Sequence, residues 1–113
     1  MNTDEIVFVH SFDTLAEEAL ANSIAHGWDD VGNDGEKIAL MHSELSEALE
    51  ALRQGNPQSD KIPELTSVDE ELADVIIRIM IFARARKLHV AEAVVEKAIY
   101  NRTRPFKHGG KLF

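Results

Sequence analysis

The 113-residue chain contains no cysteine, which excludes a disulfide framework and any metal site built from thiolates. It also lacks a long apolar run, since the longest, 75–83, is interrupted by Arg78 and is too short to cross a bilayer. The apolar residues 6–9 are too few for a signal peptide and follow acids instead of a basic segment. These absences predict a cytoplasmic protein that is stabilised by packing.

Basic residues are scarce. The 12 Lys and Arg stand against 20 Asp and Glu, and a net charge of −8 argues against binding to nucleic-acid polymers. A hydrophobic content of 44% is typical of a globular protein, so the chain is not expected to be disordered. Its length predicts a single domain over residues 1–113.

Apolar spacing, capping residues and chain breakers predict an all-α fold of four to five helices. The expected helices are one from a cap at Ser11 or Asp13 to Gly27, then about Glu36 to Gln54 with Asn33 or Asp34 as its cap, about Val68 to Lys87, and about Val90 to Arg102. Residues 1–10 are expected to form an N-terminal arm, in which 6–9 make a short strand or pack on a neighbour. Pro105 is expected to stop the fourth helix, and residues 103–113 are expected to form a flexible basic tail.

The third expected helix is apolar nearly all round. The segment 67–70 fits a capping box with Ser67 as the cap, and Asp74 and Arg78 lie four residues apart, as helical ion pairs do. The β-branched run 75–77 would also suit a strand, but the cap and the ion-pair spacing favour a helix. Because such a helix must be covered on more than one side, we expect a second subunit to supply the extra cover.

Two acid pairs are the main functional signal. Glu44 and Glu47 lie three apart on the second helix, and Glu71 and Asp74 repeat this spacing on the third, beside the apolar stripe in both cases. A short linker makes the two helices neighbours, so four carboxylates are expected to face one another and to raise each other's pKa unless a cation neutralises them. Oxygen ligands favour Mg²⁺ or Mn²⁺ over zinc. Acids at this spacing are also common on solvated helix faces, which is the alternative.

Other candidates concern a phosphorylated substrate, because Mg²⁺ commonly binds phosphates. Lys97, Asn101 and Arg104 share one helical face and, with Lys111 of the tail, could contact phosphate, or they could simply complement a helix C-terminus. Trp28, in the loop 27–35, would either stack on a base or close the core.

The pattern Glu44-x-x-Glu47, Glu71-x-x-Asp74 and Lys97-x-x-x-Asn101-x-x-Arg104 resembles the MazG-like family of the all-α NTP pyrophosphatase superfamily, from about residue 36 to 111. The resemblance implies an α-helical bundle that works as a dimer or tetramer. It also implies hydrolysis of a nucleoside triphosphate between the α and β phosphates, the substrate being a canonical nucleotide such as dUTP or dCTP or a damaged one. The four acids would hold Mg²⁺ and act in catalysis, while Lys97, Asn101 and Arg104 would contact phosphate or sugar.

Two other readings remain open at this point. The chain could be a nucleotide-binding or regulatory helical oligomer of the same fold without turnover. It could also be a structural helical dimer whose acids form a solvated face. The preferred base, and the choice between dimer and tetramer, do not follow from the residues.

Overall fold

The structure, a computed structural model, describes residues 1–28 and 32–113. Five helices are assigned within these ranges: α1 (Thr3–Ala25), α2 (Asp34–Arg53), α3 (Ser67–Ala85), α4 (Val90–Arg102) and α5 (Lys107–Gly110). The only β pairing in the described part of the chain is an isolated antiparallel bridge between Gln58 and Thr66. The prediction of an all-α chain is therefore confirmed.

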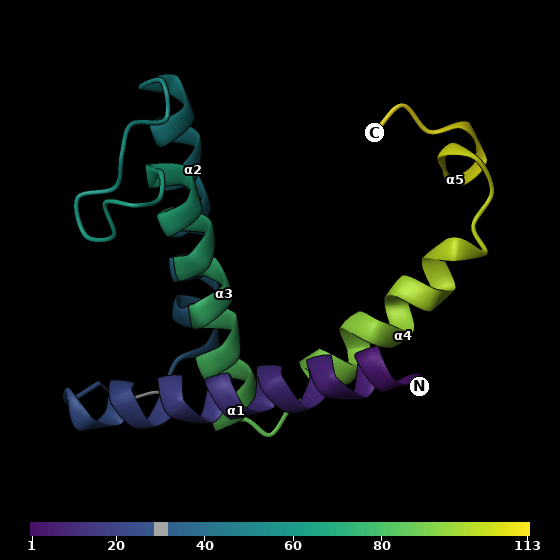
Figure 1. Cartoon of the computed structure of the whole chain (residues 1–113), viewed down its shortest axis with the longest axis horizontal. Helices are drawn as coiled ribbons and strands as arrows, with labels where there is room; N and C mark the ends of the chain where they lie inside the picture. The colour runs from purple at the N-terminus through teal and green to yellow at the C-terminus, as the bar shows by residue number, and fades with distance from the viewer. Residues whose placement is uncertain (29–31) are drawn as a thin grey trace.

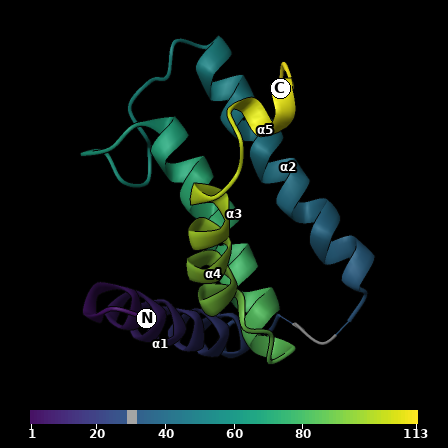
Figure 2. The same ribbon diagram turned by 90° about the vertical axis from the view of Figure 1, so that its right-hand side faces the viewer.

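Figure 1 shows α2 and α3 side by side and antiparallel, while α1 runs across one end of this pair. Helix α4 packs on the N-terminal part of α1 and then projects away from α2 and α3, carrying α5 with it. In the view turned by 90°, α4 overlaps α3 (Figure 2). Figure 1 shows that the two helices diverge from each other along the direction of that view. The acid pairs of α2 and α3 consequently lie on one arm of the molecule and the basic C-terminal segment on the other.

The first helix begins much earlier than predicted. Asn2 and Glu5 form a capping box, in which the Asn2 side chain accepts from the Glu5 N–H at 2.9 Å and Glu5 accepts from the Asn2 N–H at 2.7 Å. The predicted start at Ser11 or Asp13, and a non-helical arm over residues 1–10, are therefore wrong. The apolar run 6–9 continues the helix, and Phe8 packs on Phe12 with ring centroids 5.8 Å apart.

The later boundaries are close to those predicted. Asn33 caps α2, as expected, and α4 has the predicted ends. The capping box of α3 is displaced by one residue, because Thr66 and Asp69 form it instead of Ser67 and Glu70. This displacement leaves the Glu70 side chain available for other contacts. The predicted flexible tail contains the short helix α5, and residues 29–31 of the predicted loop 27–35 lie outside the described residues.

Backbone hydrogen bonds join the two ends of the linker between α2 and α3. The Ser67 N–H donates to the Pro57 carbonyl at 2.8 Å, and the Ser59 N–H donates to the Leu65 carbonyl at 2.9 Å. Ser59 is buried, and its hydroxyl oxygen accepts from the N–H groups of Lys61 and Ile62. These bonds hold the C-terminal end of α2 close to the start of α3 and so help to set the register of the two helices.

The core of the single chain is small. Among the described residues, five of the seven buried apolar ones are alanines, whereas Leu72, Ile76 and Ile77 of α3 remain 44%, 49% and 43% exposed. The radius of gyration is 16.4 Å, against about 13 Å for a compact domain of this length. No helix in the described part of the chain combines the length and apolar character needed to cross a membrane. The single chain therefore leaves much of the apolar surface of α3 uncovered.

Candidate metal centre

Carboxylates from α2 and α3 meet between the two helices. Oxygen atoms of Glu44, Glu47 and Glu71 lie within 4.8 Å of one another, and so do oxygen atoms of Glu70, Glu71 and Asp74. Glu71 belongs to both groups and joins them into one acid cluster. The structure thus brings together the four acids that the sequence singled out, and it adds Glu70.

The acid cluster is electrostatically strained. The pKa of Glu71 is raised from 4.5 to about 7, chiefly by burial, then by a hydrogen bond and charge repulsion from Glu47, with smaller contributions from Glu44 and Asp74. The pKa of Asp74 is also raised, first by burial and then by the charges of Glu44 and Glu70. The neighbouring carboxylates therefore contribute to the raised pKa values of Glu71 and Asp74, two of the four acids for which the sequence predicted such an effect.

The residues of the acid cluster fit a hard divalent cation. Glu71 Oε2 is buried and has no hydrogen-bond partner in the structure, which is costly for a carboxylate oxygen unless another group satisfies it. Oxygen atoms of Glu44 and Glu47 on α2, and of Glu70 and Asp74 on α3, lie within 4.8 Å of an oxygen of the Glu71 carboxylate. An all-oxygen donor set of this kind suits Mg²⁺ or Mn²⁺.

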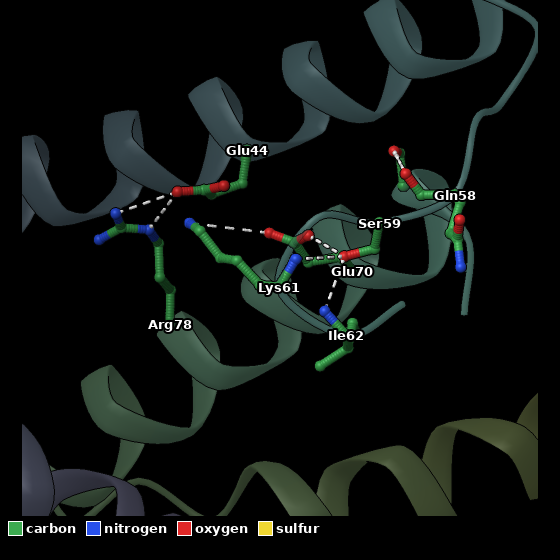
Figure 3. Close-up of polar contacts among 8 residues, drawn as sticks. Glu44, Gln58, Ser59, Lys61, Ile62, Glu70 and Arg78 are labelled. Atoms are coloured by element: carbon green, nitrogen blue, oxygen red, sulfur yellow. Dashed lines mark hydrogen bonds and ion pairs between the residues drawn. The ribbon is translucent and has the colours of Figure 1, made fainter. Parts of the chain in front are cut away.

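Glu70 is the acid that the sequence analysis missed. Its side chain accepts a hydrogen bond from the Ser59 hydroxyl at 2.5 Å, and its other oxygen lies 3.8 Å from Lys61 Nζ. Figure 3 shows both partners reaching it from the linker. The sequence signal for Glu70 is its position next to Glu71. The predicted capping box over 67–70 gives Glu70 a different role and so hides this signal.

Arg78 also occupies a place that was not predicted. Its Nε and Nη2 atoms both lie 3.1 Å from Glu44 Oε1 on the neighbouring helix, as Figure 3 shows. The expected pairing with Asp74 within α3 is thus replaced by hydrogen bonds to Glu44, although the Arg78 charge still lowers the pKa of Asp74. Arg78 is therefore the cation in direct contact with the α2 side of the acid cluster.

A pocket of about 700 Å³ adjoins the acid cluster at Arg78. It lies between the end of α1 and helices α2 and α3, and Trp28 and Phe82 line it together with Arg78 and Arg86. Arg86 is held by Asp34, with Nη2 2.7 Å from Oδ1, and its guanidinium stacks 3.8 Å above the Phe82 ring. Trp28 itself is 69% exposed, so closing the core, one of its two predicted roles, is not what this chain alone shows.

The predicted phosphate-binding residues do not reach the acid cluster within one chain. Lys97 and Arg104 lie on and just after α4, where their cationic groups are 4.4 and 5.9 Å from the Tyr100 ring centroid. Asn101 is exposed on the same helix, and Lys111 follows α5. Figure 1 places this whole arm away from α2 and α3.

Comparisons with protein-family profiles, with curated proteins and with solved structures give no match to this chain. The evidence for a function of this chain therefore comes from the acid cluster and its surroundings.

Proposed function

We propose that the chain is a Mg²⁺- or Mn²⁺-dependent nucleoside triphosphate pyrophosphohydrolase of the cytoplasm, of the kind found in the MazG-like family. The observation that supports this most directly is the buried, unpartnered oxygen of the Glu71 carboxylate, a group that lies close to the acids of α2. A purely structural helix pair gains nothing from such a group, because replacing it by an apolar or amide side chain would remove both the burial cost and the repulsion.

In this proposal, Glu44, Glu47, Glu71 and Asp74 would hold the cation, and Glu70 would support them from the linker side. A bound Mg²⁺ would neutralise phosphate charge and lower the pKa of a water molecule. A cluster carboxylate accepts a proton from the water that attacks the α-phosphorus. The bond from this phosphorus to the oxygen that bridges to the β-phosphate then breaks, which yields the monophosphate and pyrophosphate.

We further propose that a second copy of the chain completes the site. Lys97, Asn101, Arg104 and Lys111 project from the separate C-terminal arm, where the same chain does not bring them to the acids. A symmetric homodimer, alone or within a tetramer, would cover the exposed apolar residues of α3 and could carry one subunit's basic arm to the other subunit's acid cluster. Trp28, at the mouth of the adjoining pocket, would stack on the base.

The test is a panel of canonical and damaged nucleoside triphosphates, assayed with Mg²⁺ for monophosphate and pyrophosphate. The variant Glu71→Gln should lose at least about 100-fold in kcat/KM, as expected when a metal ligand or proton acceptor is removed. The control Glu50→Gln removes an exposed acid of the same helix, where Glu50 contacts only Arg53 and Gln54 among the contacts given by the structure, and should keep its activity.

The bond that breaks can be identified in ¹⁸O-labelled water. Attack at the α-phosphorus places the label in the monophosphate, whereas label in the pyrophosphate or release of orthophosphate would contradict the proposed reaction. Tight nucleotide binding without any turnover would favour the alternative, a non-catalytic nucleotide-binding oligomer. Equal activity in Glu71→Gln and the parent protein would contradict the role of the acid cluster.

A further inference from the structure

Arg78 is the positive charge that makes two close contacts with the acid cluster. Its side chain is 38% exposed and that of Glu44 is 12% exposed, so the ion pair is partly shielded from water. Two nitrogen atoms of one guanidinium contact the same carboxylate oxygen, which fixes the orientation of both side chains. Lys61, the other cation at the cluster, differs in that it is 83% exposed and stands 3.8 Å from Glu70.

The position of this ion pair matters for metal binding. Glu44 Oε1 is the atom that Arg78 contacts, and Glu44 also contributes an oxygen to the group formed with Glu47 and Glu71. A guanidinium at this oxygen offsets part of the negative charge of the acid cluster. A divalent cation bound at Oε1 would share or displace that contact, and one bound at the other Glu44 oxygen would still be repelled by the positive charge of Arg78 at short range.

From this geometry we propose that Arg78 is an internal counter-ion, which competes with the divalent cation for Glu44 and turns to the phosphates of the substrate once the cation has bound. This inference depends on the metal site in the proposed function. The second half follows from where Arg78 lies: its side chain also lines the adjoining pocket, beside Arg86. A guanidinium that loses its carboxylate partner in a partly buried place needs another anion, and a phosphate group provides one with matching geometry.

Arg78 would then be the phosphate-binding cation of the same chain, whereas Lys97 and Arg104 lie on the other arm. Cation and phosphate would consequently favour each other's binding, because the cation frees the arginine that the phosphate uses.

The experiment measures Mn²⁺ binding directly, by electron paramagnetic resonance of the free ion at pH 8, in the full-length parent protein, Arg78→Gln and Arg84→Gln. The control Arg84→Gln removes an equal charge from the same helix, but Arg84 is paired with Glu17 of α1. Arg78→Gln should bind Mn²⁺ about tenfold more tightly than the parent, since a positive charge next to a ligand atom is removed. Arg84→Gln should match the parent, and circular dichroism melts confirm that each variant is folded.

The second measurement is binding of inorganic pyrophosphate at saturating Mn²⁺, followed by calorimetry. Arg78→Gln should bind pyrophosphate about tenfold more weakly, and Arg78→Lys should recover part of the loss. Equal Mn²⁺ affinity in the parent and Arg78→Gln would overturn the competition while leaving the metal site intact. No Mn²⁺ binding in any of the three proteins would overturn the metal site itself, and with it the inference. Weaker Mn²⁺ binding in Arg78→Gln would show that Arg78 supports the ligands and does not compete for them.

Discussion

Glu71 couples the protonation of the acid cluster to the stability of the fold. Its pKa is about 7 in the folded chain and near 4.5 when the side chain is exposed. Between these two values the folded state binds more protons than the unfolded state, so the free energy of unfolding falls as the pH rises from about 4.5 to about 7. Above that range both states are ionised and the full cost of the buried charge is present.

The first prediction compares the parent protein with Glu71→Gln in thermal melts without divalent cations. The amide has no charge to bury, so the variant should gain stability relative to the parent as the pH rises from 5 to 8. Adding Mg²⁺ at pH 8 should raise the melting temperature of the parent and have little effect on the variant. A difference between the two proteins that stays constant with pH would contradict the assignment of the shifted pKa to Glu71.

A second prediction at the residue scale concerns Ser59. The substitution Ser59→Ala removes the hydroxyl that donates to Glu70 and accepts from two backbone N–H groups. Since these groups lie in a part-buried site, the loss should lower the free energy of unfolding by about 1–3 kcal/mol. Chemical denaturation measures this change, and Ser46→Ala is a control, because Ser46 is exposed and its hydroxyl donates only within α2, to His42.

At the scale of the elements, the start of α3 decides which acids face α2. The capping box uses Thr66 and Asp69, and the hydrogen bonds to Thr66 lower the pKa of Asp69. One residue of displacement turns Glu70 from a capping group into a member of the acid cluster. The linker reinforces this arrangement through the Asn56 side chain, which accepts from the Val68 N–H at 2.9 Å.

This cap gives the third prediction. Thr66→Ala should lower the free energy of unfolding by about 1 kcal/mol, the usual cost of losing an N-cap side chain. Ser67→Ala should have a much smaller effect, because the Ser67 hydroxyl makes only one long contact, 3.4 Å from the Gln58 carbonyl. Urea titration of both variants measures the two changes in the free energy of unfolding. A larger loss of stability in Ser67→Ala than in Thr66→Ala would contradict the observed cap.

How far the sequence predicted these elements depended on the range of the interactions involved. The ends of α4 and the Asn33 cap follow from local signals, and the meeting of the two acid pairs follows from helical spacing and a short linker. The predicted start of α1 is wrong because a short apolar run such as 6–9 suits a strand as well as a helix. The capping box that begins the helix lies further upstream, at Asn2 and Glu5. The contact between Arg78 and Glu44 joins residues 34 apart in the chain, so local spacing, which favoured Asp74, could not reveal it.

At the scale of the whole molecule, large apolar side chains are exposed along α1, α2 and α3. Between these helices lies an apolar pocket of about 770 Å³, lined by Leu15, Ala19, Ile76 and Ile77 among other residues. The buried residues of the single chain are mostly alanines, which bring helices close together but remove little apolar area from water. Association with a second copy would bury the larger side chains and would contribute about 25 cal/mol for each Å² of apolar surface removed from water.

The fourth prediction tests this association. Ile76→Glu should shift the protein from dimer to monomer in analytical ultracentrifugation, because a charge on the exposed face of α3 would have to be desolvated on association. Leu65→Glu is the control, since Leu65 is similarly exposed at 50% but lies in the linker. If the dimer also supplies the basic arm, Ile76→Glu should lose phosphohydrolase activity in parallel with dissociation. An unchanged sedimentation coefficient would contradict an interface on α3.

The hydrogen bonds that join the two ends of the linker between α2 and α3 have a practical consequence. Because backbone hydrogen bonds close the loop at Pro57, Ser59, Leu65 and Ser67, an added group at its tip should leave the register of α2 and α3 unchanged. The chain has no thiol of its own, so Glu64→Cys would offer a single attachment point for a fluorescent dye. Such a dye would sit on the same loop as Lys61, which reaches Glu70, and its emission would follow the filling of the acid cluster in real time.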